Sequence, residues 1–363
     1  MTVYIEFLSL RSFFADILSE LINKRYYDDK TSIFYFIDAN KLGVLVANLF
    51  SKFLGCKFNR LDFKHIDIKD EKGDLISLRI GRKDIHIIQD QIFNSDAYKV
   101  LLRKEWKDNR IIEYLQKGIL DKNANQIYDK HSIGRALFLL QVVSWHMKKI
   151  GKSKGTLFLK NRGWMNIFSE YGLQLNINVI PTQSYNDKHL NKIVYKYPYL
   201  YNILKFIKTH STLQRPSKSY DKMVPKLFLD SKKHYNFNND GYKSDFSFCD
   251  QSDFPIENIL VRSSLTYEKK LLSGKGFHIA DGFKGIKISN KRSKVPLPVR
   301  TNTYIKESNE LGAVINKYNF EKSRWASFFK SHNVKVFLSW YKFSNSHIAM
   351  ADAIEEIGGI SVI

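Results

Sequence analysis

Three polar side chains follow a predicted strand near the end of the chain and form the best candidate for a binding or catalytic site. Residues 334–339 alternate as a buried strand does. Tyr341, Lys342 and His347 come in the following turn and at the start of the next helix. In open α/β sheets ligands bind beyond the carboxyl ends of strands, and a helix N-terminus beside cations suits a phosphate or a sugar hydroxyl. The alternative is a solvated turn with a helix cap and a hydrogen-bonded histidine.

A similar arrangement occurs in the first half of the chain. Arg162 and Trp164 stand between a predicted strand at 156–160 and a predicted helix at 163–171. Arg162 can hold a carboxylate or a phosphate through two parallel hydrogen bonds, and Trp164 can stack on the face of a sugar. Alternatively, Trp164 is a core residue that starts the helix and Arg162 is a surface residue. Asp38 ends another predicted strand and is either a base or the N-cap of the next helix.

The common signatures of catalytic and cofactor sites are absent. The chain contains no G-x-G-x-x-G, no P-loop and no H-E-x-x-H. It also has no D-x-D, the carboxylate pair that holds a divalent metal on a nucleotide diphosphate in many sugar transferases. We therefore expect no metal site and no cofactor, so that a sugar transferase built by this chain would be metal-independent.

The hydrophobic pattern predicts an α/β fold made of Rossmann-like βαβ units with parallel sheets. Apolar strands and amphipathic helices alternate over the first fifty-odd residues, again from 156 to 180, and again from 334 to 363. Parallel strands need a crossover helix between them, which is the order seen in all three places. Short alternating runs around a turn at 71–74 predict a small antiparallel insert near residues 57–88.

The length of 363 residues allows two domains. We expect an N-terminal α/β region at 1–183, with the β-hairpin insert and a helical block, and a Rossmann-like domain at 255–363. Residues 184–254, rich in Lys and Tyr, are predicted to be a basic, aromatic linker between them. Because the sequence ends on a predicted strand with no closing helix, the C-terminal domain is expected to be incomplete at its C-terminus.

The composition indicates a folded, basic protein. There are 58 Lys and Arg against 36 Asp and Glu, a formal net charge of +22. Such a charge favours an anionic partner: nucleic acid, an acidic membrane surface or a phosphorylated substrate. Alternatively, the excess of Lys and Arg reflects an overall bias in the amino-acid composition and serves no particular partner. Two distant cysteines argue against a disulfide framework, and no apolar run is long enough for a membrane span. We expect a cytoplasmic protein, with peripheral attachment at the inner membrane face as an option.

Short motifs at 36–39, 61–63, 158–164, 171–172, 334–347 and 358–360 are spread over most of the chain. Through them the chain resembles bacterial surface-polysaccharide biosynthesis proteins of the GT-B glycosyltransferase type. The resemblance implies two facing Rossmann-like domains, no obligatory metal, and a nucleotide-sugar donor bound mainly by the C-terminal domain. The acceptor is then a polysaccharide or a lipid-linked sugar.

Three functions follow as hypotheses. In the first, a glycosyltransferase of cell-surface polysaccharide synthesis uses His347 and Lys342 as catalytic residues, and Tyr341, Arg162 and Trp164 to bind substrate. In the second, the charge of +22 serves a basic nucleic-acid-binding protein. In the third, the chain is a noncatalytic scaffold in the same polysaccharide pathway, which agrees with the lack of a diagnostic motif.

Overall fold

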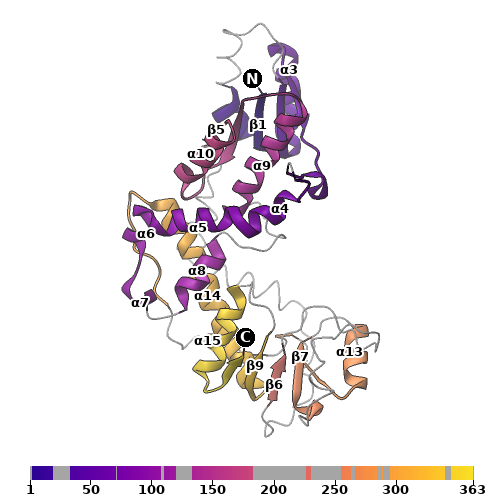
Figure 1. The fold of residues 1–363 in the computed structure, drawn as a ribbon, viewed down its shortest axis with the longest axis vertical. Helices are drawn as coiled ribbons and strands as arrows, with labels where there is room; N and C mark the ends of the chain where they lie inside the picture. Colours follow the sequence, from indigo (N-terminus) through magenta and orange to yellow (C-terminus); the bar gives the residue numbers. More distant parts are fainter. Residues whose placement is uncertain are drawn as a thin grey trace. The chain divides into compact units, whose positions relative to one another are not determined.

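The chain forms two compact α/β units (Figure 1). The computed structural model describes residues 2–18, 33–70, 72–107, 110–119, 133–182, 226–229, 255–262, 266–280, 282–283, 286, 288, 295–339 and 345–362. Unit 1 comprises residues 1–102, 119–205 and 298–312, and unit 2 comprises residues 103–118, 206–297 and 313–363. Each unit contains one five-stranded sheet in which every pairing is parallel. The predicted α/β class with Rossmann-like units is confirmed.

The sheet of unit 1 has the strand order β3-β2-β1-β4-β5. Its strands are β1 (Thr2–Leu8), β2 (Ile33–Ala39), β3 (Lys57–Arg60), β4 (Gly155–Lys160) and β5 (Ile177–Thr182). Burial of all six residues of β4 is typical of a parallel strand that is covered on both faces. The strand order reverses direction between β1 and β4, which makes their carboxyl ends the switch point of the sheet.

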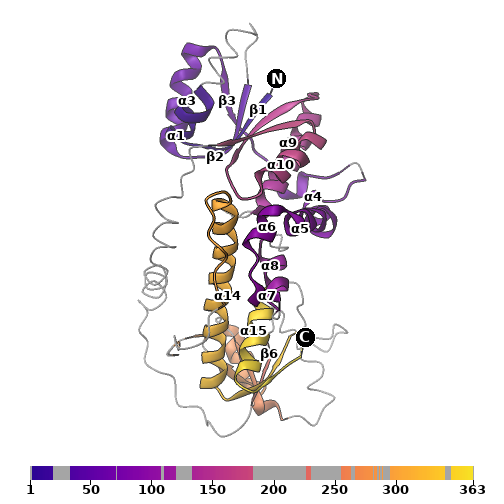
Figure 2. The same ribbon diagram turned by 90° about the vertical axis from the view of Figure 1, so that its left-hand side faces the viewer.

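Helices cover both faces of this sheet. On one side lie α1 (Leu10–Ser12), its continuation η1 (Phe13–Ile17) and α3 (Lys41–Leu54), and on the other lie α9 (Ile133–Lys149) and α10 (Met165–Gln174) (Figure 2). Between β3 and α9 come η2 (His65–Asp67), α4 (Ile76–Arg79), η3 (Ile80–Asp84), α5 (Ile85–Asn94), α6 (Asp96–Leu101), α7 (Lys104–Lys107) and α8 (Ile111–Ile119). Residues 103–118, which include α7, belong to unit 2.

Unit 2 repeats the same sheet topology. Its strands are β6 (Lys226–Leu229), β7 (Ile259–Arg262), β8 (His278–Ala280), β9 (Val334–Leu338) and β10 (Ile360–Val362), in the order β10-β9-β6-β7-β8. Its other elements are η6 (Ile256–Asn258), α13 (Thr266–Gly274), α14 (Ile305–Ser331, counted with unit 2 from Ala313) and α15 (Asn345–Glu356). If the strands of each unit are numbered 1 to 5 in chain order, both sheets have the spatial order 3-2-1-4-5. This is the doubly wound order of dinucleotide-binding folds.

The core of unit 2 is aromatic. Phe228, on the central strand β6, lies within 5.6 Å, centroid to centroid, of the rings of Trp325, Phe328 and Phe329 on α14. α14 and α15 pack against this face of the sheet, and Leu272 of α13 packs against the opposite face. Both faces are therefore buried, as the continuous apolar strands require.

The structure does not contain the antiparallel insert predicted near residues 57–88. β3 pairs in parallel with β2, and residues 76–94 form α4, η3 and α5. The short alternating run at 75–80 belongs to a longer series of buried isoleucines that recur every three to five residues, which is helical spacing. The buried isoleucines of this series are Ile76, Ile80, Ile85, Ile88 and Ile92.

The tight turn inside that segment is present. The Asp70 carboxylate accepts hydrogen bonds from the backbone N–H groups of Lys72 and Asp74, each at 3.0 Å. Beside the turn, Lys69 and Leu75 form an isolated antiparallel bridge. The turn chemistry was therefore predicted correctly, but the strands on either side of it were not.

The predicted linker at 184–254 contains a central element of the fold. Residues 226–229 form β6, which lies between β7 and β9 in the second sheet. The rest of that stretch lies outside the described residues. A sheet strand was missed here because β6 is only four residues long and stands in a strongly basic stretch.

None of the helices in the described part of the chain combines the length and the apolar character that crossing a bilayer requires. α14 is long enough, at 27 residues, but it carries charged side chains along its length. α9 is the more apolar helix, and its 17 residues fall short of the roughly 20 that a membrane span needs. Its apolar side chains are used instead to cover the first sheet.

Gly43 sets how closely α3 packs on the end of β1. The Asn40 side chain caps α3 by accepting the Gly43 N–H at 2.7 Å. A Cβ at position 43 would lie 2.6 Å from the carbonyl oxygen of Leu8 and 2.7 Å from the Cα of Ser9. The contact is with backbone, which cannot rotate away, so the space is open to glycine alone.

We expect Gly43→Ala to lower the free energy of unfolding by about 1–3 kcal/mol in denaturant titrations. Alanine normally stabilises a helix interior relative to glycine, by about 1 kcal/mol. Gly274→Ala, at the last residue of α13, is the control, because no atom lies within 4 Å of its added Cβ. A Gly43→Ala protein as stable as the wild type would show that α3 does not need this close approach.

Candidate functional site

A charged side chain stands in the central strand of unit 1, near its carboxyl end. Glu6 lies on β1, and its side chain is 5% exposed. One carboxylate oxygen accepts a hydrogen bond from Nη2 of Arg162 at 2.6 Å. The other accepts the backbone N–H of Lys160 at 2.7 Å. Because Lys160 ends β4, Glu6 ties the carboxyl ends of β1 and β4 together at the switch point.

A second arginine extends the cluster to β2. Arg135, in the first turn of α9, places its Nε 3.4 Å from Glu6 Oε1. Its Nη2 donates a hydrogen bond to Asp38 Oδ2 at 2.7 Å. The Asp38 side chain is 27% exposed, whereas that of Arg135 is 7% exposed. Asp38 is therefore the group of this cluster that solvent and ligands reach most easily.

We call Glu6, Asp38, Arg135 and Arg162 the Glu6 network. Burial by itself raises the pKa of Glu6, but the charges and hydrogen bonds of Arg162, the Lys160 N–H and the charge of Arg135 lower it below its ordinary value. Glu6 is therefore ionised at neutral pH and balances the buried guanidinium groups. The network is a charge-paired frame with one accessible carboxylate.

Arg162 binds a carboxylate of the protein itself, through one hydrogen bond and not through the two parallel bonds that were predicted. Its side chain is 1% exposed, and the carboxylate that it contacts is Glu6. It also donates a bond to the Lys160 carbonyl oxygen at 3.3 Å. Among the described residues, Arg162 is a residue of the buried frame and does not lie on a surface open to substrate.

Trp164 is a core residue and does not offer its face to a sugar. Its side chain is buried, and its indole N–H donates to Ser95 Oγ at 3.0 Å. Its backbone has φ of 56° in the left-handed region, and its N–H donates to Glu307 Oε1 at 2.9 Å. The predicted stacking role is wrong for this structure, because no face of the indole is exposed.

Asp38 does not cap the helix that follows its strand. Asn40 is the N-cap of α3, since its side chain accepts the Gly43 N–H. Asp38 stands two residues earlier, at the end of β2, where it meets Arg135. Of the two predicted roles, the capping role is excluded, and the carboxylate stays open to a role as base.

Two arginines meet at the carboxyl end of a strand in unit 2, and we call Arg262 and Arg324 the arginine pair. Arg262 ends β7, and its guanidinium carbon lies 4.9 Å from the ring centroid of Trp325. Arg324, on α14, has its guanidinium carbon 3.5 Å from the ring centroid of Phe283. The Arg262 guanidinium lies 5.8 Å from that same ring. Phe283 thus brings the two cations to one place.

The two charges influence each other. Burial, and secondly the charge of Arg262, lower the pKa of Arg324, while Glu321 acts in the opposite direction. Both side chains are half-buried. When a guanidinium stacks on an aromatic ring, its plane lies parallel to the ring. Its N–H groups then point outward within that plane, where they can donate hydrogen bonds to an oxyanion. Two such groups together suit a phosphate or diphosphate, which accepts several charge-assisted hydrogen bonds.

The site predicted at the end of β9 is described only in part. His347 lies in the first turn of α15 and is 2% exposed, so its ring is part of the packed interior of unit 2. Tyr341 and Lys342 lie outside the described residues. Their position relative to His347 is therefore not described, and Arg162 and Trp164 belong to unit 1.

The sequence contained signals for the residues that were missed. Glu6 is a charged residue inside an apolar strand, which is rare unless a partner is buried beside it. Arg262 comes at the carboxyl end of a predicted strand, the same criterion that selected His347. Arg324 gave no signal, because a lone arginine on a helix is ordinary. Its importance depends on Phe283, which is far away along the chain.

The described residues contain no group of three or more His, Cys, Asp or Glu side chains that could hold a metal ion. Comparisons of the chain with models of protein families, with curated proteins and with solved structures found no match.

Proposed function

We propose that this chain is a metal-independent glycosyltransferase of the GT-B type, which transfers a sugar from a nucleotide-sugar donor in the synthesis of a cell-surface polysaccharide. The observation that supports this most is the repeated topology, because one chain holds two parallel sheets with the same doubly wound order. Each sheet has a switch point, where folds of this kind bind nucleotides and sugars.

The donor is assigned to unit 2. The arginine pair at the end of β7 provides two cations for the diphosphate of a nucleotide sugar. Charge builds up on this diphosphate as the sugar leaves, and cations held in place before the reaction stabilise that charge. Lys342, predicted for the same purpose, keeps that role in the proposal.

The acceptor is assigned to unit 1, with Asp38 as the base. The acceptor hydroxyl oxygen forms a bond to the anomeric carbon, and its proton passes to the Asp38 carboxylate. The bond from the anomeric carbon to the diphosphate oxygen breaks, and the electron pair leaves with the nucleoside diphosphate. Asp38 replaces His347 in this role because its side chain is 27% exposed and that of His347 is buried.

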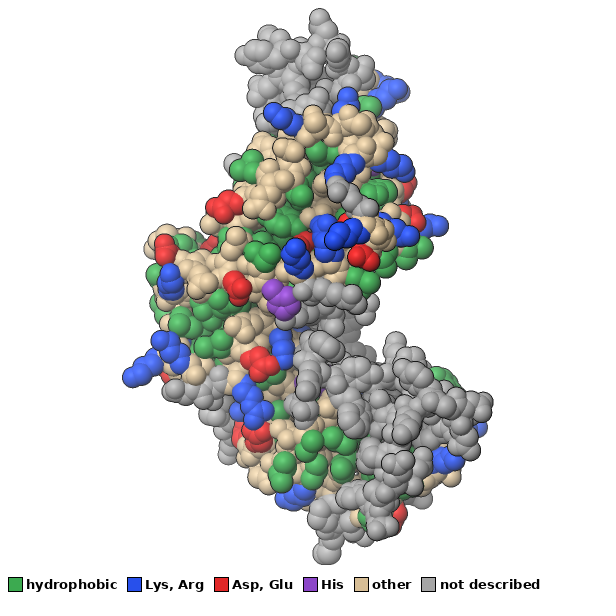
Figure 3. Space-filling view, viewed as in Figure 1, with side chains coloured by type: hydrophobic (Ala, Val, Ile, Leu, Met, Phe, Trp, Pro, Cys, Tyr) green, Lys and Arg blue, Asp and Glu red, His purple; other side chains and the backbone are tan. Residues whose placement is uncertain are grey.

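The nucleic-acid-binding alternative has less support in the arrangement of charge. On the face drawn in Figure 3, Lys and Arg side chains are spread over both units and are interspersed with Asp and Glu. A protein that follows a phosphate backbone gathers its cations in a stripe or a patch. Among the described side chains on this one face, the spread of charge gives the nucleic-acid role less support than a role that needs few, local phosphate contacts.

The test is turnover of nucleotide sugars by the purified protein. Uridine-, guanosine-, cytidine- and thymidine-linked sugars are incubated with the protein and a lipid extract that contains acceptors, and released nucleotide is separated by anion exchange. We expect release from at least one donor, and a loss of release in Asp38→Asn. No release from any donor, together with oligonucleotide binding that falls steeply with salt, would support the nucleic-acid role instead.

A further inference from the structure

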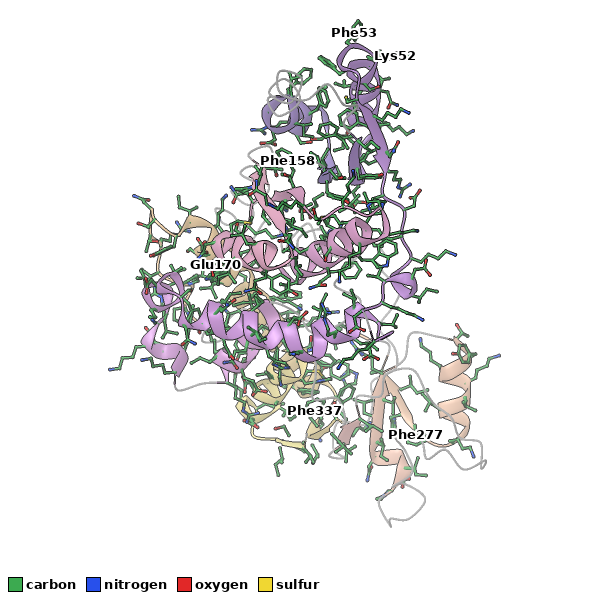
Figure 4. The ribbon with its side chains drawn as sticks, turned by 45° about the horizontal axis from the view of Figure 1, so that its top comes forward. Lys52, Phe53, Phe158, Glu170, Phe277 and Phe337 are labelled. Atoms are coloured by element: carbon green, nitrogen blue, oxygen red, sulfur yellow. The ribbon has the colours of Figure 1, made fainter. Side chains whose placement is uncertain are left out.

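The outer face of α3 is apolar and exposed. Leu42, Leu45, Leu49 and Phe53 are 61%, 56%, 51% and 75% exposed. Successive residues of a helix are about 100° apart, so these four fall within an arc of about 80°. They form one stripe along the helix, and Figure 4 shows Phe53 beside Lys52 on the outside of its last turn.

The inner face of the same helix already has its partners. Ala47 is fully buried, and Val44, Val46 and Phe50 pack on the core of unit 1. A surface helix of a globular protein normally has apolar residues on the side that packs on the core and polar residues on the exposed side. In α3 four exposed positions are apolar as well, so packing within unit 1 does not explain the stripe.

The stripe continues onto the neighbouring helix. Leu10 and Phe14, on α1 and η1, are 42% and 49% exposed. The ring of Phe14 meets that of Phe50 edge to face, at 5.7 Å between centroids, which packs η1 against α3. We call Leu10, Phe14, Leu42, Leu45, Leu49 and Phe53 the α3 face. Contiguous exposed apolar surface of this kind marks an interaction site.

The exposed charges of the described residues near the α3 face are positive. Arg11, Lys41, Lys52 and Lys57 are all exposed beside it. α3 contains no acidic residue, and the single acid in residues 9–18, Asp16, is buried. On the helix, Lys41 and Lys52 project next to Leu45, at one edge of the stripe. An apolar stripe edged by cations fits the interface of an anionic bilayer, with leucine and phenylalanine among the acyl chains and lysine at the headgroups.

We propose that the α3 face docks this protein on an anionic lipid bilayer, as an interfacial surface that does not span it. The charge decides against a second copy of the chain as occupant, because two such faces would bring their cations together. The proposal does not depend on the glycosyltransferase chemistry. Docking would hold the protein where lipid-linked acceptors lie.

The test is sedimentation of the full chain with vesicles of phosphatidylcholine alone and of phosphatidylcholine mixed with phosphatidylglycerol. We expect binding to the mixed vesicles at least tenfold tighter than to the neutral ones, and weakened by 0.5 M salt. Leu45→Gln with Leu49→Gln should weaken it at least tenfold, and Lys41→Gln with Lys52→Gln should remove the preference for anionic lipid. Leu173→Gln is the control, since Leu173 is 65% exposed on α10, away from this face.

Two results would overturn the proposal. In one, the protein binds mixed vesicles no better than neutral ones, or the double leucine variant binds as the wild type does. In the other, sedimentation velocity shows a dimer that the double leucine variant abolishes, which would assign the face to a second copy. Circular dichroism and thermal unfolding of every variant separate loss of docking from loss of fold. Vesicle binding is measured without donor or acceptor, so failure of the proposed chemistry leaves this test intact.

Discussion

Glu6→Ala is expected to lower the free energy of unfolding by about 3–5 kcal/mol, the range for removing one partner of a buried ion pair. The reason is the burial of Arg162 and Arg135, whose side chains are 1% and 7% exposed and would lose the carboxylate between them. Denaturant titration measures the change. The matched control is Asp62→Ala, because its partner Arg60 is a surface residue, and a loss under about 1 kcal/mol is expected there.

A second variant separates the charge from the packing. Combining Glu6→Gln with Arg162→Met removes both charges of the closest pair, and it should recover part of the stability that Glu6→Ala loses. If Glu6→Ala cost no more than Asp62→Ala, the Glu6 network would not be a buried frame, and its arginines would be open to solvent or ligand.

The loss of stability at low pH gives an independent measure of what the Glu6 carboxylate contributes to folding. The pKa of Glu6 is lowered in the folded protein, so its contribution to stability is present above the ordinary glutamate pKa of about 4.3 and is lost as the pH falls below it. In that window the unfolded chain binds a proton that the folded protein does not. The wild type should therefore lose stability on acidification more steeply than Glu6→Gln.

Trp164→Ala is the second large effect, with an expected loss of about 3–5 kcal/mol in the free energy of unfolding. The indole is fully enclosed and donates to Ser95 Oγ, so its removal leaves a cavity and one hydrogen bond fewer at that hydroxyl. Trp164→Phe keeps most of the volume and should lose less. Leu173→Ala, on the exposed side of the adjacent helix α10, should change stability by no more than about 0.5 kcal/mol.

This variant also distinguishes the two predicted roles of Trp164. A residue that stacks on a ligand contributes to binding and little to folding. If Trp164→Ala unfolded at the same denaturant concentration as the wild type but bound donor or acceptor more weakly, the core assignment would be wrong.

The regular βαβ elements could be predicted from the sequence because each is marked by local residues. α3 (Lys41–Leu54) ends at Gly55, which has φ of 62° and is a helix-stop signal visible in the sequence. The strand predicted at 156–160 lies within one residue of β4. Burial on both faces gives such strands an apolar run that needs no tertiary information.

Other elements were missed because their local signals were weak or ambiguous. α14 extends from Ile305 to Ser331, and the sequence pattern did not predict its first half as helical. Its first half carries Lys306, Glu307 and Glu310 and has no simple apolar face. The run at 75–80 fits both a period of two and a helical spacing over so short a length, so the local pattern was compatible with either.

The candidate sites depend on partners that are distant in sequence. Glu6 and Arg162 are 156 residues apart, and Asp38 and Arg135 are 97 residues apart. No local pattern pairs such residues, although the unusual charge inside β1 indicated that a partner exists. The arginine pair requires β7, β8 and the middle of α14 to come together around Phe283.

The central claim is that unit 2 binds the diphosphate of a nucleotide donor through the arginine pair. Titration calorimetry of the nucleoside diphosphates of uridine, guanosine, cytidine and thymidine against the full chain tests it without a known acceptor. The account predicts that at least one of them binds. It further predicts that Arg324→Gln weakens binding tenfold or more, since a charge-assisted hydrogen bond contributes about 1.5–3 kcal/mol. Lys330→Gln, which removes an exposed charge from the same helix, should leave binding unchanged. Absence of binding by all four, or equal binding by wild type and Arg324→Gln, would contradict the claim.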